Sequence, residues 1–279
     1  MSVLSGLVHS FALEKYMKKG LNSYQLKLIA LCFMILDHLY SNLNWPMHEY
    51  MNWPFWPQWI PVITRFVSPL FLYLMIDGFY HTRSRRKFLT RLSAVALIML
   101  VGNVILNYIF HNVDTRTGEY TFRSLINGNN IFLTLAVLFA FVWCLENIKQ
   151  RNKVVPNIVL AVAIGTFSLF LEGGLELLPV TLIVWFFHER KALQCVGICV
   201  WSGLLLAKAL FSYFTGPAVT SLYTDLCFDN EWAMFVVIFF ILLYNGERGK
   251  NTKFSKYLFY VIYPIHLWIL EIVRNLIIP

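Results

Sequence analysis

Residues 26–40 read LKLIALCFMILDHLY, an apolar stretch that places a cation, a carboxylate and an imidazole inside one predicted membrane span. Around it, apolar runs long enough to cross a hydrocarbon core of about 30 Å recur along the whole chain. The 279 residues are 58% hydrophobic and 14% charged, whereas soluble domains carry about 25% charged residues. The sequence therefore predicts an all-α, polytopic membrane protein.

The apolar runs predict about nine spans in one transmembrane domain, residues 23–279, preceded by an interfacial amphipathic segment, residues 1–22. The sixth and eighth runs are short, so we expect one of them to be tilted or re-entrant. The runs lie at roughly 24–43, 60–80, 89–110, 131–145, 154–172, 175–188, 193–212, 232–245 and 256–276.

Basic residues gather in alternate loops, which predicts that those loops face the cytoplasm. The same alternation puts the N-terminus inside and the C-terminus outside, and it explains the net charge of +8 without a nucleic-acid partner. The five cysteines show no metal-ligand spacing, so we expect neither a metal nor a disulfide. The predicted cytoplasmic groups are Lys15/Lys18/Lys19, Arg83/Arg85/Arg86/Lys87/Arg91, Lys149/Arg151/Lys153, Arg190/Lys191 and Arg248/Lys250/Lys253/Lys256.

The first external segment, residues 44–61, concentrates four tryptophans among four prolines. Such a segment is typical of the aromatic belt at a membrane interface. The alternative is a lid or docking surface for a substrate on the outer side.

Ionisable groups inside a bilayer are costly, so each one in the first span is a candidate for a functional site. Lys27 and His38 are eleven residues apart, close to three helical turns, which puts both on one helix face about 16 Å apart. That distance fits a donor with a phosphate head at the cytoplasmic mouth and a thioester on a long arm, as in acetyl-CoA. His38 would then be the general base. Alternatively, Lys27 snorkels and the Asp37-His38 pair makes a polar packing contact.

The second span adds Arg65 at about the depth of Asp37, and we expect it to pair with that carboxylate or to stabilise an oxyanion. The span ends near Asp77 and His81, before a basic cluster. That cluster is explained by topology alone, or it binds CoA phosphates. The residues predicted to bind the donor are Lys27, His81, Arg83, Arg85 and Lys87.

Polar residues also stand in later spans. Asn130 and Thr134 open the fourth, Lys208 lies in the seventh, and His266 follows Pro264 in the last. Each is as well explained by helix packing as by function, because neighbouring helices can satisfy buried polar groups.

Five segments together resemble the TraX family, which is named for an acetylase of the conjugative pilus subunit. They are LKLIALCFMILDH (26–38), residues 65–92, NNIFLTLA (129–136), LYNGERG (243–249) and KYLFYVIYPIHL (256–267). The resemblance covers about residues 24–270. Where the family has an Asp-Tyr-Gly stretch on the outer side, this chain reads LEGGLELLPVTL (171–182).

The resemblance implies a multi-pass acyltransferase of a bacterial cytoplasmic membrane, similar to acyltransferase family 3, whose first span carries a cation, ten residues and a histidine. Carried over, His38 is catalytic with Asp37 and Arg65, and Lys27 is on the CoA path. Further members of the pocket would be Asn130, Thr134, Tyr244, Asn245, Arg248, Tyr263 and His266.

The sequence thus favours acetyl transfer from acetyl-CoA to a hydroxyl or amine of an unidentified peptide, glycan, lipid or small molecule. Two other classes stay open: a transporter or flippase that uses the buried charges as an ion pathway, and a non-catalytic partner in an assembly complex. Transporters often show paired repeats with broken helices. We find no internal repeat, which favours the enzyme.

Overall fold

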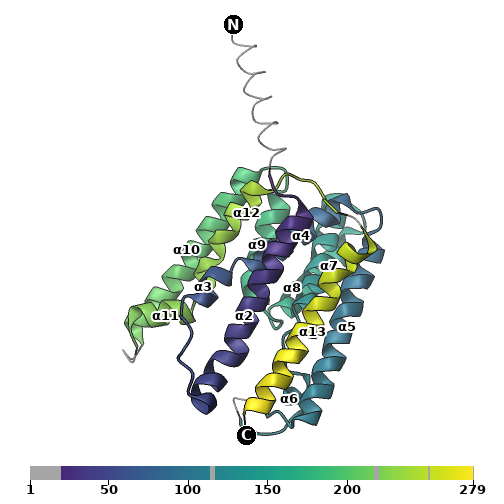
Figure 1. The fold of residues 1–279 in the computed structure, drawn as a ribbon. Coiled ribbons are helices and arrows are strands. Elements are labelled where there is room, and N and C mark those ends of the chain that lie inside the picture. Colours follow the sequence, from purple (N-terminus) through teal and green to yellow (C-terminus); the bar gives the residue numbers. More distant parts are fainter. Residues whose placement is uncertain (1–19, 114–116, 217–219, 251, 279) are drawn as a thin grey trace.

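The computed structural model describes residues 20–113, 117–216, 220–250 and 252–278 (Figure 1). The predicted interfacial segment falls almost entirely outside these ranges. Within them the chain is helical, and its only β-type pairing is an isolated bridge between Leu21 and Tyr244. The all-helical bundle predicted from the sequence is confirmed.

Seven of the nine predicted apolar runs overlap a single helix, and the other two, 60–80 and 232–245, each overlap two consecutive helical elements. The helices are α2 (Ser23–Met51), α3 (Ile60–Thr64), α4 (Val67–His81), α5 (Arg85–Ile109), α6 (Phe122–Ile126), α7 (Ile131–Lys149), α8 (Val154–Ser168), α9 (Gly174–Phe186), α10 (Lys191–Thr215), α11 (Leu222–Phe228), the 3-10 helix η1 (Glu231–Val236), α12 (Val237–Leu243) and α13 (Lys253–Ile277).

Six helical units among the described residues are long and apolar enough to cross a membrane, with α3 and α4 counted as one unit. A pair bent by 64°, Leu222–Phe228 with Glu231–Leu243, brings the number to seven if it is one span. The eighth predicted run is the second half of that pair. The sixth is α9, which with α8 is shorter than a full span. The chain is a multi-pass membrane protein.

Helix α2 is longer than its apolar run because it continues through the tryptophan-rich segment to Met51. Asn22 starts the helix by a reciprocal capping box with Gln25. The helix accommodates Pro46 and ends at Asn52, which takes a left-handed conformation with φ 55°. His38 therefore lies in the middle of a continuous helix of 29 residues.

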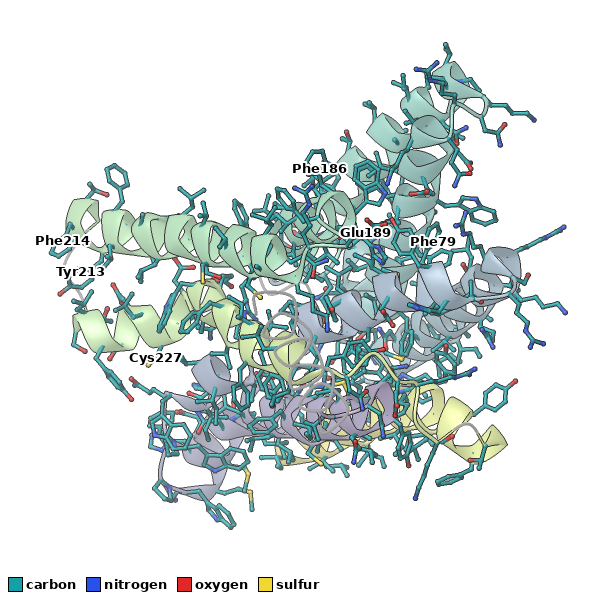
Figure 2. The ribbon with its side chains drawn as sticks, turned by 90° about the horizontal axis from the view of Figure 1, so that it is seen from above. Phe79, Phe186, Glu189, Tyr213, Phe214 and Cys227 are labelled. Carbon is teal, nitrogen blue, oxygen red and sulfur yellow. The ribbon has the colours of Figure 1, made fainter. Side chains whose placement is uncertain are left out.

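The first and last helices of the described bundle, α2 and α13, lie side by side and begin at the same end of the molecule (Figure 1). Helix α4 packs inside the bundle, where Phe66 stacks on Phe240 at 4.2 Å and Phe79 meets Phe139 at 5.1 Å. Viewed from above, α10 projects from the bundle, with Phe214 at its far end (Figure 2). Such exposed apolar side chains suit contact with lipid.

The loop after α12 holds the first turn of α2. The backbone N–H groups of Ser23 and Tyr24 donate to the carbonyls of Glu247 and Arg248, at 2.8 and 3.2 Å. These are N–H groups that a helix start cannot satisfy internally. The LYNGERG segment thereby places Arg248 about one turn from Lys27.

Candidate functional site

A cavity of about 90 Å³ lies beside His38 in the middle of the bundle. Elements distant in sequence surround it: α2, the junction of α3 and α4, the start of α7, the α8–α9 connection and α13. Its lining combines polar and apolar groups. The lining residues are Met34, Asp37, His38, Thr64, Arg65, Val67, Ser68, Phe71, Ile131, Glu172 and Tyr263.

His38 is buried and bonded to a second histidine from the last helix. Its Nδ1 lies 2.7 Å from Nε2 of His266, and the two rings are nearly parallel, with centroids 5.0 Å apart. Tyr263 packs edge-on against both rings. The sequence suggested both histidines, and the structure brings them together.

The contacts of His266 fix the tautomers of both rings. Its Nδ1 is 2.8 Å from the carbonyl of Ile262, which can only accept, so this nitrogen carries the proton. In a neutral ring, Nε2 of His266 is then an acceptor, and His38 donates to it from Nδ1. Nε2 of His38 keeps its lone pair and has no hydrogen-bond partner among the described residues. His38 is thus arranged as a neutral base.

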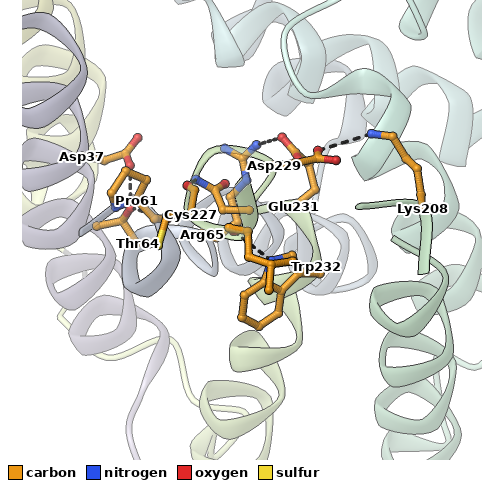
Figure 3. A network of polar contacts seen from close by, with 11 residues as sticks. Asp37, Pro61, Thr64, Arg65, Lys208, Cys227, Asp229, Glu231 and Trp232 are labelled. Carbon is orange, nitrogen blue, oxygen red and sulfur yellow. Dashed lines mark hydrogen bonds and ion pairs between the residues drawn. The ribbon is translucent and has the colours of Figure 1, made fainter. Parts of the chain in front are cut away.

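The expected pairing of Arg65 with Asp37 is wrong. Thr64 donates to the Asp37 carboxylate at 2.5 Å, whereas Arg65 forms its ion pair with Glu231 (Figure 3). Arg65 stands at the break between α3 and α4, from which its side chain reaches η1 instead of α2. Both Asp37 and Arg65 still line the cavity.

The polar contacts continue outward from Arg65. Asp229, in the bend before η1, forms an ion pair with Lys208 of α10 at 3.4 Å (Figure 3). The Arg65–Glu231 pair connects the α3–α4 break to the segment around residues 229–231, and the Lys208–Asp229 pair connects α10 to the same segment. Lys208, which the sequence left open between structure and function, lies in this network and not among the cavity-lining residues.

Glu172 is a cavity residue that the sequence reasoning missed, because it was assigned only to an external loop. Its carboxylate accepts the backbone N–H of Asn130, and its carbonyl accepts the Thr134 hydroxyl at 2.8 Å. Asn130 also caps α7 and donates to Ala96 of α5 at 2.9 Å. The polar start of α7 therefore anchors the segment that departs from the family pattern. The sequence feature that could have identified Glu172 is a carboxylate between two apolar runs.

The other predicted pocket residues divide between two places. Tyr263 and His266 contact His38, and Asn130 and Thr134 bond Glu172 of the same cavity. The Tyr244 hydroxyl instead donates to Asp77 at 2.8 Å, at the end of the bundle where α2 begins. Asn245 and Arg248 belong to the loop beside it. Lys27 lies one turn after Tyr24, whose backbone N–H donates to the Arg248 carbonyl, and it therefore belongs to this second cluster.

The remaining predicted donor-binding residues lie in the stretch from the end of α4 to the start of α5. The nearest to this second cluster is His81, whose Nδ1 bonds the backbone carbonyl of Asp77 at 2.8 Å. The Arg85 guanidinium packs over the Phe79 ring at 4.0 Å. Arg83 and Lys87 are exposed.

A larger groove of about 570 Å³ between α5, α7 and α8 is lined almost entirely by aliphatic residues, which suits lipid chains.

Comparison with known proteins gives two similarities along almost the whole chain. The family model described as TraX protein matches residues 22–274. A curated relative, the probable fimbrial assembly protein FimC of serogroup H1 from Dichelobacter nodosus, is 24% identical over 258 residues, which cover 89% of this chain and 94% of the relative. No solved structure matches.

Proposed function

Because the chain belongs to the TraX family, we propose that it is an integral membrane acyltransferase that moves an acetyl group from acetyl-CoA to a hydroxyl or amine. The observation that carries this proposal is the unbonded Nε2 of His38 beside a polar cavity, with Nδ1 held by His266. A buried imidazole in that tautomer is suited to accept a proton from a nucleophile.

In the proposed reaction, the acceptor O–H or N–H gives its proton to Nε2 of His38 as its oxygen or nitrogen attacks the thioester carbonyl. The oxyanion that forms is stabilised by Arg65, whose guanidinium has N–H groups beyond the one that pairs with Glu231. The C–S bond then breaks, and the proton on His38 passes to the departing CoA sulfur. His266 keeps the same hydrogen bond throughout, so it orients the base without exchanging a proton.

The two polar clusters support a division of labour along α2. Lys27, about 16 Å from His38 along the helix axis, would hold the donor at the end where α2 begins, and its pantetheine arm would reach the cavity. The basic loops favour an orientation with this end of the bundle in the cytoplasm. The donor would then bind from the cytoplasm, and the acceptor would receive the acetyl group nearer the outer face of a bacterial cytoplasmic membrane. Asp37, bonded to Thr64, would position that acceptor.

The name of the curated relative suggests an acceptor class. The curated relative is named a probable fimbrial assembly protein, so we propose a protein of the fimbrial or pilus system as the first acceptor to test. The same name favours a second candidate function, a non-catalytic role in assembly. An acetyltransferase removes the acetyl group from acetyl-CoA, whereas a non-catalytic assembly partner does not.

The proposal is tested with radiolabelled acetyl-CoA and membranes of cells that produce the protein together with a pilin. We expect label in protein with the wild type and none above background with His38→Ala. CoA binding to purified protein, measured by calorimetry, should persist in this variant because the change lies far from Lys27. Equal labelling by both proteins would refute His38 as the base, and a wild type that neither labels pilin nor releases CoA would favour the assembly role.

A further inference from the structure

The end of the bundle where α2 begins holds more positive charge than its own carboxylates balance. Lys27 makes no hydrogen bond or ion pair with any residue the structure describes. The carboxylate that acts on it, Asp77, already accepts the Tyr244 hydroxyl at 2.8 Å and lies 3.5 Å from His81. Lys27 also experiences the like charge of Arg248. Partly buried cations are not left unpaired without cost.

A third cation joins them from α5. Nε of Arg91 is buried and has no hydrogen-bond partner, although the guanidinium lies 5.6 Å from the Phe88 ring. The charges of Arg91 and Arg248 both act on Tyr260 of α13. Helix α13, which carries Tyr260, packs against both α2, the helix of Lys27, and α5, the helix of Arg91.

The backbone holds these groups in place. The carbonyl of Arg248 accepts the N–H of Tyr24 at 3.2 Å, in the helical turn that precedes Lys27. On α13, Phe259 packs against Tyr24 with ring centroids 6.1 Å apart, which sets Tyr260 beside the same turn. Three neighbouring elements, α2, α5 and the loop after α12, thus each contribute a cation at this end of the bundle. Such an arrangement suits an anion with more than one charge.

We infer that Arg91 and Arg248 join Lys27 in a site for the diphosphate of the acyl donor, with Tyr260 as a hydroxyl donor. The inference rests on the proposed function, because it assigns this anion to CoA. It also changes the residues expected to hold the donor. Arg85 packs over the Phe79 ring at 4.0 Å, whereas the buried Nε of Arg91 has no hydrogen-bond partner among the described residues.

Calorimetry on the full chain in phosphatidylcholine nanodiscs tests the site, with CoA and inorganic pyrophosphate as separate probes. We expect Arg91→Gln and Arg248→Gln each to weaken both ligands at least about tenfold, since each removes a charged hydrogen-bonding group. Arg86→Gln is the matched control. It removes the same charge from an exposed position of α5 and should change binding by less than about twofold.

The outcomes separate this inference from the proposed function. CoA binding that both arginine variants retain would overturn the site, while acetyl transfer by the wild type would leave the enzyme proposal intact. Pyrophosphate binding that depends on Arg91 and Arg248, without CoA binding by the wild type, would support the anion site and remove acyl-CoA as the donor. Anionic lipid that copurifies with the wild type and not with the variants, together with unchanged CoA binding, would assign the cations to a lipid headgroup and overturn the inference.

Discussion

Replacement of His266 by alanine should slow acetyl transfer without weakening donor binding. The ring accepts the hydrogen bond from Nδ1 of His38 at 2.7 Å and is itself fixed by the Ile262 carbonyl. Without it, the buried N–H of His38 loses its partner, and the proton is free to move to Nε2. In that second tautomer the base has no lone pair toward the acceptor.

The expected magnitude follows from the hydrogen bond that is lost. A buried donor left without a partner costs about 1–3 kcal/mol. If the activation free energy rises by that amount, turnover falls roughly 5- to 150-fold at 25 °C. The apparent Michaelis constant for acetyl-CoA should stay within about twofold, because the donor head is proposed to bind about 16 Å away.

Steady-state acetyl transfer with purified protein in nanodiscs measures both constants. His266→Gln should recover part of the turnover, because its side-chain carbonyl can still accept from His38. His48→Ala is the control. It removes a histidine from the far end of α2, where the ring bonds the carbonyl of Trp53 at 2.8 Å. Full turnover by His266→Ala, or an equal loss in the His48 control, would refute the orienting role.

Three further outcomes are expected. Glu172→Ala should lower the free energy of unfolding by about 1–3 kcal/mol, because it removes the acceptor of the Asn130 N–H, whereas Glu172→Gln should keep most of the stability in a thermal melt. Gly174→Ala should greatly reduce the yield of folded protein on size-exclusion chromatography, because the added Cβ would lie 1.6 Å from the carbonyl oxygen of Ser168; Gly203→Ala meets nothing within 4 Å and should behave as wild type. In a cysteine-free background, a cysteine at Arg83 should react with an impermeant maleimide from the cytoplasmic side and a cysteine at Trp56 from the outer side, and the reverse would invert the proposed orientation.

The helices could be predicted from the sequence because hydrophobic length is a local property. Helical periodicity could predict the site only where its members share one helix, and the members on other helices, such as Tyr263 and His266, followed from the family resemblance. Lys27 and His38 are related by helical periodicity alone. The contact of His38 with His266 depends on how α2 and α13 pack, and no local pattern specifies that.

The error at Arg65 has the same origin. Equal depth in the membrane suggested a pair with Asp37, but depth does not say which way a side chain points around its helix. The break between α3 and α4 turns Arg65 toward Glu231, and Thr64 takes the place beside Asp37. Glu172 was missed because a residue between two helices carries no periodicity that relates it to the first span.

The contact between His38 and His266 joins residues 228 positions apart, which has a consequence for biogenesis. Asp37 and Thr64 belong to the first two spans and can meet early in synthesis. The Glu247–Arg248 backbone that holds the start of α2 is made much later, and His266 is made after it. A nascent chain that stops before α13 would contain the three cations inferred for the donor, yet it would lack His266, which orients the base, and Tyr260, the inferred hydroxyl donor. Synthesis of α13 is therefore the step that allows the His38–His266 contact to form.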